Sequence, residues 1–303
     1  MSDARLGYVG LGNIGGPMAA RLAKWPGGLS VFDLAPQAVA TLVDQGAGAA
    51  QSLADLGSRA DIIGICVVDD DQVRTVVAGD GGLLSTAAPG TIITVHSTIS
   101  PDTATELAQT CAASGVVLLD APISGGAPGA EQGRLAIMVG GDRDSYTRIK
   151  EPFALTADMI VHAGNDVGAG TKMKLARNLL HFISFTATTE AARLAEAAGI
   201  DIAKLGKVVR HTDAITGGAG AIMLRDTTAP IDPDDFWYGI FTHVRTLGEK
   251  DLGLALGLAE QLGVDLPLGQ IALRDLADGL GVGHAHKGCL LYTSDAADER
   301  SSV

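Results

Sequence analysis

Short apolar runs alternate with amphipathic stretches over the first 160 residues of the chain. The apolar runs have the length and composition of buried strands, and the stretches between them repeat apolar residues at helical spacing. The expected strands are Arg5–Val9, Leu29–Phe32, Asp61–Val68, Thr91–Val95, Val116–Asp120, Arg134–Gly140 and Ile160–Ala163. A first helix ends near Lys24, and others are expected over 70–78, 102–114 and 142–156. This alternation predicts a doubly wound α/β domain of the Rossmann type, with a mainly parallel sheet, in residues 1–163.

A single long helix is expected to follow that domain. After Gly170 nothing breaks a helix until Gly199, which gives roughly 30 residues or about 45 Å of helix. Its first two turns carry cations and an amide, whereas the later turns are apolar almost all round. We therefore interpret residues 164–199 as a linking segment between two domains, buried around its girth and polar at its first end.

Only helical patterns follow Asp201, so residues 200–283 are expected to form an all-α domain. The expected helices are 202–212, 220–225, 242–262 and 268–280, with a loop over 230–238. After Gly283 the periodicity stops, and Cys289-Leu-Leu-Tyr-Thr-Ser-Asp-Ala-Ala-Asp-Glu299 resembles translated adapter DNA. We expect residues 284–303 to be a poorly ordered, non-native tail and exclude them from function.

Composition limits the classes of partner. The 303 residues carry a net charge of −13 and a pI of about 4.8, so the overall field repels nucleic acid and anionic membranes. The three cysteines, Cys66, Cys111 and Cys289, show no disulfide or zinc spacing. The N-terminus leads directly into an expected strand, and no apolar run approaches 18 residues. We expect a cytoplasmic protein with no metal.

The first strand and helix enclose a glycine motif with a specific physical meaning. Gly10, Gly12 and Gly15 form G-x-G-x-x-G with Asn13 and Ile14 between them, and Asp33 ends the next strand. Such glycines let the backbone approach a pyrophosphate, and an acid at this position can bind a ribose 2′-hydroxyl. Asp33 would repel a 2′-phosphate and Leu34 supplies no cation, which favours NAD over NADP. The alternative is a glycine turn that only packs the helix on the strand.

Further candidates follow from the ends of the strands and from the long helix. Ligands of such sheets bind at the carboxyl ends of strands, where this chain carries Val67-Val68, Ser97-Thr98 and Ser124-Gly125-Gly126. Lys174 and Asn178 are four residues apart, so both lie on one face of the long helix, which His181 continues. We place the chemistry on this face.

Four blocks in order resemble the β-hydroxyacid dehydrogenases, a family that includes 3-hydroxyisobutyrate dehydrogenase and tartronate semialdehyde reductase. The blocks are G-L-G-N-I-G-G-P-M-A from Gly10, D-A-P-I-S-G-G from Asp120, G-A-G-T-K-M-K-L-A-R-N from Gly168 and K-D-L-G-L-A from Lys250. They span the chain to about Gly283. The resemblance implies a Rossmann domain, a linking helix and a helical domain that forms a homodimer or homotetramer.

The same resemblance implies roles for individual residues. Lys174 would be the acid/base and Asn178 a partner of the lysine and substrate, while Ser124, Gly125 and Gly126 would hold a substrate carboxylate. Thr98 would lie near the nicotinamide, and Lys250 would close the site. Arg177 departs from the family's usual Asn or His, so it is a candidate clamp for the anionic substrate; the related 6-phosphogluconate dehydrogenases carry His here. Independently of the resemblance, His211 in Arg-His-Thr-Asp213 is a candidate substrate contact from the helical domain; the alternative is that it caps a helix before Gly217.

These residues predict an oxidoreductase that moves a hydride between NAD(H) and a small 3-hydroxy acid or its semialdehyde. A lysine ammonium can give a proton to the oxygen that becomes negative, provided that its pKa is lowered by burial or neighbouring cations. Alternatives are an imine reductase, a 6-phosphogluconate dehydrogenase-like enzyme, and a non-catalytic dinucleotide-binding or assembly module. Tyr146 and Lys150 match a Y-x-x-x-K motif of short-chain dehydrogenases, but their amphipathic context indicates a solvated helix face.

Overall fold

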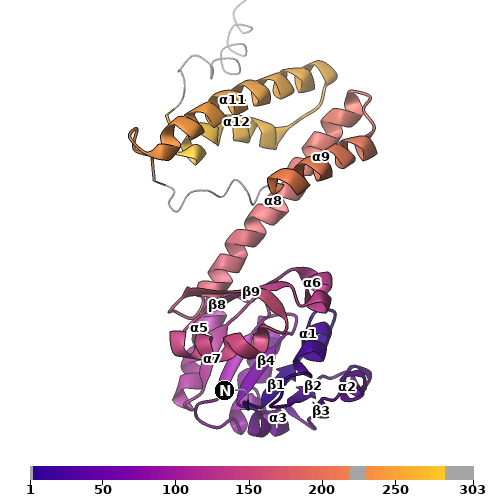
Figure 1. Cartoon of the computed structure of the whole chain (residues 1–303), viewed down its shortest axis with the longest axis vertical. Coiled ribbons are helices and arrows are strands. Elements are labelled where there is room, and N and C mark those ends of the chain that lie inside the picture. Colours follow the sequence, from indigo (N-terminus) through magenta and orange to yellow (C-terminus); the bar gives the residue numbers. More distant parts are fainter. Residues whose placement is uncertain (1–2, 219–228, 284–303) are drawn as a thin grey trace, which may run out of the picture. The chain divides into compact units, whose positions relative to one another are not determined.

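The computed structural model describes residues 3–218 and 229–283 (Figure 1). The chain divides into two compact units, Met1–Leu179 and Leu180–Val303, and the boundary falls inside one long helix. No helix of the described residues is long and apolar enough to cross a membrane. The expected helix over 220–225 and the tail 284–303 lie outside the described residues.

The first unit contains a mainly parallel sheet in the order β3-β2-β1-β4-β5-β6-β8-β7, with β9 also paired to β8. Strands β1 to β6 pair in parallel, and β8 runs antiparallel to β6 and β7. Strand β9 is parallel to β8. The bounds are β1 Leu6–Val9, β2 Leu29–Phe32, β3 Gly48–Ala49, β4 Ile62–Ile65, β5 Ile92–Val95, β6 Val117–Asp120, β7 Ile123–Ser124, β8 Leu135–Gly140 and β9 Ala157–Gly164.

Successive strand residues point to opposite sides of the sheet, so both faces carry apolar side chains, and helices cover both faces. Tyr8 of β1 packs in one apolar cluster with Met18 and Phe153, and the next residue, Val9, packs in a second cluster with Val73. The helices are α1 Gly15–Leu22, α2 Pro36–Val43, α3 Leu53–Arg59, α4 Asp70–Ala78, α5 Pro101–Ala113, α6 Gly126–Gln132 and α7 Arg143–Phe153. The doubly wound α/β fold is confirmed.

Several elements of the first unit were not expected from the sequence. They are α2, α3, α6 and the short strands β3 and β7. The segment of α6, Gly-Ala-Pro-Gly-Ala-Glu-Gln, has poor helix propensity, so its helical form depends on tertiary contacts. Ala130 of this helix is fully buried in the same cluster as Met18 and Leu135. Packing on α1 and β8 therefore outweighs the local preference for a turn.

The described part of the second unit is helical and contains no strand. Its helices are the later turns of α8 Ala169–Ala197, with α9 Ile202–Thr216, α11 Phe236–Leu262 and α12 Pro267–Leu280. The loop expected over 230–238 is too long: α11 begins at Phe236 because the Asp235 carboxylate accepts a hydrogen bond from Trp237 N at 2.7 Å.

The expectation that α8 is buried around its girth holds for Lys174 and Glu190, which are 8% and 6% exposed, but not for several of its apolar side chains. Leu175, Leu180 and Ile183 are 44%, 39% and 48% exposed. The apolar composition of these turns therefore does not reflect burial within the first unit or the second unit as described.

Candidate active site

The glycine loop joins β1 to α1 at the carboxyl edge of the sheet. Gly10 has φ +89°, and a Cβ there would overlap the carbonyl oxygen of Cys66. A Cβ on Gly15 would overlap the carbonyl oxygen of Gly10, whereas one on Gly12 would meet nothing within 4 Å. Gly10 and Gly15 are thus needed for the loop to pack, and Gly12 borders open space.

The start of α1 is suited to an anion. Ile14 is the N-cap and offers no side-chain hydrogen bond to the first turn, and no acidic residue lies in that turn. The first N–H groups of a helix carry a partial positive charge when no side chain caps them. Asn13 beside them is exposed. This loop therefore fits the pyrophosphate that its sequence predicts.

Asp33 is held rigidly at the end of β2. One carboxylate oxygen accepts from Leu11 N at 2.6 Å and the other from Ala35 N at 2.7 Å. Each oxygen keeps acceptor capacity for a further donor. The carboxylate faces a cavity of about 510 Å³ that is also lined by Gly10, Gly12, Leu34, Val67 and Val68. Leu34 and Val68 are 91% and 81% exposed, so apolar surface borders this carboxylate.

Ser97 fixes the strand end that carries Val67. Its hydroxyl accepts from Val67 N at 2.9 Å and donates to Val67 O at 2.8 Å, which ties the end of β5 to the end of β4. Thr98, the expected nicotinamide contact, follows it and is exposed. The cavity beside these strand ends thus combines open space, the Asp33 carboxylate and apolar walls, which are the features that a dinucleotide site requires. No role for Ser97 itself could be predicted from the sequence, because a bond across 30 residues leaves no local pattern.

Lys174 lies near the start of α8 and is only 8% exposed. Its Nζ donates to Ser124 Oγ at 3.4 Å, so the structure brings together two expected site residues that are 50 positions apart. Burial lowers the pKa of Lys174 from its ordinary value, and the positive charge of Arg177 lowers this pKa further. Arg177 is exposed and donates from Nη1 to Asn178 Oδ1 at 3.3 Å.

Ser124, Gly125 and Gly126 form the passage from β7 into α6. Ser124 is half-buried, and the two glycines are exposed. Their φ values of +131° and +64° lie in the region that favours glycine. The sequence predicted a Ser-Gly-Gly turn at these residues. In the structure Ser124 ends strand β7, and helix α6 begins at Gly126. Its exposed backbone lies beside the hydroxyl that Lys174 contacts.

Asp120, for which the sequence predicted no role of its own, organises this region. Its side chain is fully buried, with one oxygen accepting from Gly168 N at 2.7 Å and the other from Thr171 N at 2.6 Å. These N–H groups belong to the start of α8, where the preceding glycine has no side chain to cap them. A carboxylate at the end of β6 thus caps the helix that carries Lys174.

Two of the predicted site residues, His211 and Lys250, lie in the second unit, and their contacts with substrate remain predictions. His211 lies on α9 and is exposed, and Lys250 lies on α11 with a side chain outside the described part of the structure. Tyr146 donates its hydroxyl to Ile160 O at 3.0 Å, a bond between α7 and β9 that gives the Y-x-x-x-K tyrosine a structural use. Residues 3–218 and 229–283 contain no cluster of His, Cys, Asp or Glu that could hold a metal ion.

Two family models match the chain almost end to end. Residues 5–164 match the NAD-binding domain of 6-phosphogluconate dehydrogenase, and residues 168–288 match the NAD-binding model of NADP-dependent 3-hydroxyisobutyrate dehydrogenase. An uncharacterised oxidoreductase of Mycobacterium tuberculosis is 56% identical over 92% of this chain and 94% of its own length. A 3-hydroxyisobutyrate dehydrogenase of Pseudomonas aeruginosa is 38% identical over 88% of this chain and 89% of its own length.

Solved structures agree with these matches. A putative oxidoreductase from Mycobacterium avium is 54% identical, covers 93% of this chain and 100% of its own, and superposes with a TM-score of 0.89. An imine reductase from Myxococcus stipitatus has a TM-score of 0.72 over 93% of this chain and 95% of its own, at 19% identity. That lower likeness shows the shared fold alone.

Proposed function

The chain belongs to the β-hydroxyacid dehydrogenase family of NAD(P)-dependent oxidoreductases, and we propose that it interconverts a small 3-hydroxy acid and its semialdehyde or keto acid. Lys174 is the proposed acid/base. The observation that carries the proposal is the burial of this lysine beside Ser124, next to the exposed Ser124-Gly125-Gly126 backbone.

The proposed chemistry divides between the chain and its cofactor. When bound, the nicotinamide accepts or supplies the hydride. Lys174 takes the hydroxyl proton during oxidation and returns a proton to the carbonyl oxygen during reduction. Its lowered pKa favours this exchange, because a neutral amine is then more accessible than at an exposed lysine. Ser124 keeps the ammonium directed at the site.

The substrate class follows from the groups around the lysine. The hydroxyl of Ser124 and the backbone of Gly125 and Gly126 offer donors for a carboxylate at little steric cost. Arg177 and Asn178 lie on the turn after Lys174, and the guanidinium suits a second contact with an anion. We therefore propose a small anionic hydroxy acid. A contact from Lys250 is supported by the resemblance to the family alone, and one from His211 by its sequence context alone.

NAD is the proposed preferred cofactor. The Asp33 carboxylate is fixed by two backbone N–H groups, so it cannot easily turn away from a ribose 2′-phosphate. Leu34 and Ala35, which follow it, offer no cation to such a phosphate. Charge repulsion would therefore disfavour NADP, while a 2′-hydroxyl could donate to the carboxylate.

A second copy of the chain is the proposed partner, through the helical domain. None of the described residues of α9 is buried, and Ile202, Val208 and Ile215 are exposed on it. Exposed apolar side chains in this number favour burial against another surface. Light scattering during size-exclusion chromatography should give a dimer or tetramer mass, and a monomer at micromolar concentration would contradict this proposal. A cytoplasmic location is proposed from the sequence alone.

Initial rates with NAD and NADP over a panel of 3-hydroxy acids, 6-phosphogluconate and cyclic imines test the proposed function. Oxidation of one or more 3-hydroxy acids with NAD is the expected result. Reduction of imines without turnover of hydroxy acids would favour the imine reductase alternative, and Lys174 argues against it because those enzymes generally lack this lysine. Cofactor binding without any turnover would favour a non-catalytic module.

A further inference from the structure

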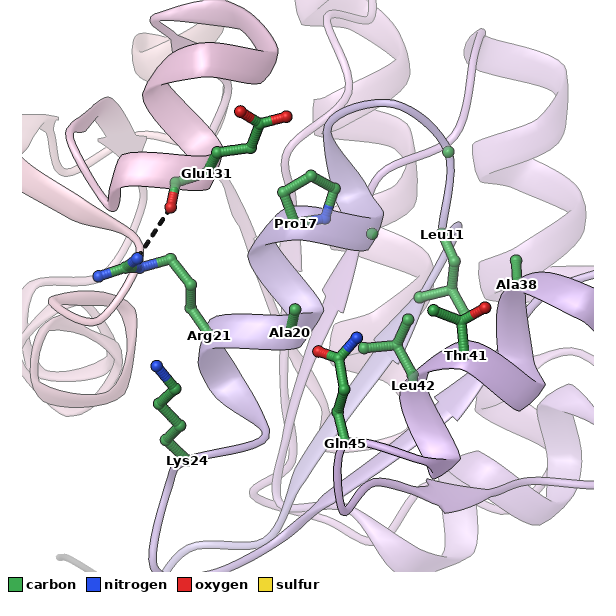
Figure 2. A pocket seen from close by; sticks show the side chains of 12 residues that line it. Leu11, Pro17, Ala20, Arg21, Lys24, Ala38, Thr41, Leu42, Gln45 and Glu131 are labelled. Atoms are coloured by element: carbon green, nitrogen blue, oxygen red, sulfur yellow. Dashed lines mark hydrogen bonds between the residues drawn. The ribbon is translucent and has the colours of Figure 1, made fainter.

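Arg21, near the end of α1, joins three segments that are distant in sequence. Its Nε donates to Leu155 O. Its Nη1 donates to Glu131 O at 2.9 Å, the bond drawn in Figure 2. Both acceptors are neutral backbone carbonyls. In the described part of the chain no carboxylate lies within ion-pair distance of this guanidinium. Its position is thus set by two directed hydrogen bonds from one planar group.

The guanidinium completes the last turn of α6. Arg134 N bonds Gly129 O and Gly133 N bonds Ala130 O, so two of the terminal carbonyls have backbone partners. The next carbonyl, that of Glu131, is the one that Arg21 takes. A cation at this end also interacts favourably with the helix dipole. Arg21 therefore acts as the missing C-terminal partner of α6.

Gly133 shows that the space is shaped for this guanidinium. It has φ +71°, and a Cβ there would overlap Arg21 Nε and lie 2.5 Å from its Cζ and Nη2. Any other residue at position 133 would displace the Arg21 side chain. Beside it lies an open pocket of about 550 Å³ lined by α1, α2 and Glu131 (Figure 2), so side-chain packing on that side adds little restraint.

The two helices that Arg21 joins carry the two halves of the proposed site. The first turn of α1 contains Gly15 of the glycine loop, six residues before Arg21. The first turn of α6 contains Gly126 of the proposed substrate segment, five residues before Glu131. At 1.5 Å per residue, each functional end is roughly 8–9 Å from the contact. A shift of α6 at this contact would reach the substrate segment, because Glu131 and Gly126 lie on the same seven-residue helix.

We propose that Arg21 is a positioning residue that sets the substrate segment Ser124–Gly126 against the glycine loop. This inference rests on the proposed function. Misplacing a substrate by about 1 Å can cost on the order of 10²-fold in rate, so Arg21 acts on turnover without touching substrate or cofactor. Because the hydrogen bonds of Arg21 go to Leu155 and Glu131 and not to the glycine loop, cofactor affinity should depend on it much less.

The test compares Arg21→Met and Arg21→Lys with a matched control, Arg5→Met. Arg5 also ties two segments, through hydrogen bonds of 3.1 and 2.7 Å to Asp61. These two residues precede β1 and β4, so their contact lies at the edge of the sheet opposite to the glycine loop. We expect kcat/KM for the hydroxy acid to fall ~10-fold or more in Arg21→Met and ~3-fold or more in Arg21→Lys. Arg5→Met should stay within about 2-fold, and NADH affinity within about 3-fold throughout. The lysine variant keeps the charge and covers the case in which Arg21→Met does not fold.

Hydrogen exchange at residues 123–133 gives a readout that is independent of turnover. Faster exchange there in both Arg21 variants, and not in Arg5→Met, is the expected result. Unchanged exchange together with unchanged kcat/KM in either folded Arg21 variant would overturn the inference. If the wild-type chain oxidises no 3-hydroxy acid, the proposed function fails, and the exchange rates still decide whether Arg21 holds this segment.

Discussion

Replacing Asp120 with asparagine tests how the helix that carries Lys174 is anchored. The carboxylate is fully buried and accepts from Gly168 N and Thr171 N at 2.7 and 2.6 Å. Asparagine keeps one oxygen, so one of these N–H groups loses its acceptor and faces an NH₂ group instead. No water-exposed alternative exists for that N–H, because the site is buried.

The expected loss can be worked from these two contacts. A hydrogen bond to a charged group contributes roughly 1.5–3 kcal/mol, and a buried N–H left without a partner costs about 1–3 kcal/mol. The variant no longer buries a charge, which offsets part of these two losses. We therefore expect Asp120→Asn to lower the free energy of unfolding by about 3 kcal/mol. Loss of the cap should also displace Lys174 from Ser124, so kcat should fall by on the order of 10²-fold.

Urea unfolding followed by circular dichroism measures this loss, with Asp142→Asn as the control. Asp142 caps α7 by accepting from Ser145 N at 2.8 Å, but it is exposed, and asparagine is as good a cap as aspartate there. The control should change stability by less than about 0.5 kcal/mol. An Asp120→Asn variant as stable and as active as the control would refute the reasoning.

Three further predictions concern the cofactor and pH. Asp33→Ala should weaken NAD binding and narrow its advantage over NADP; an unchanged ratio of the two kcat/KM values would remove the proposed role. Burial lowers the pKa of His96 from 6.5 to about 4. Between these two values the His96 imidazole is protonated in the unfolded chain and neutral in the folded chain. The free energy of unfolding should therefore fall by about 3 kcal/mol as the pH drops across that window. Urea titrations of His96→Asn should show a flatter pH dependence, and an unaltered slope would contradict this. Arg177→Met removes a cation that lowers the pKa of Lys174, so the alkaline limb of the reduction rate should move to higher pH; a limb that stays in place would show that this pKa does not control the rate.

Local chemistry made the cofactor half of the site predictable. The glycine loop and Asp33 lie within two neighbouring strand ends, so their spacing alone places them together. Helical spacing likewise put Lys174 and Asn178 on one face. The relative positions of these residues follow from local secondary structure, so they could be predicted without knowing the tertiary fold.

The remaining contacts depend on pairs that are far apart in sequence. Asp120 meets Gly168 across 48 residues, and Arg21 meets Glu131 across 110. No periodicity or spacing encodes such a pair, because each partner is satisfied only after the sheet has formed. The only sequence feature that pointed to Asp120 was its place in the D-A-P-I-S-G-G block that resembles the family. The start of α11 was missed for a local reason, since Asp235 is an N-cap that was interpreted as part of a loop.

The catalytic proposal depends most directly on Lys174, and the decisive measurement is the rate of hydride transfer in Lys174→Met. Stopped-flow absorbance of NADH should show the step slowed by on the order of 10²–10⁴-fold relative to the wild-type chain. NADH affinity measured on the same variant should stay within about 3-fold, because Lys174 contacts Ser124 and does not line the cavity at Asp33. Hydride transfer at a near-normal rate in this variant would contradict the account.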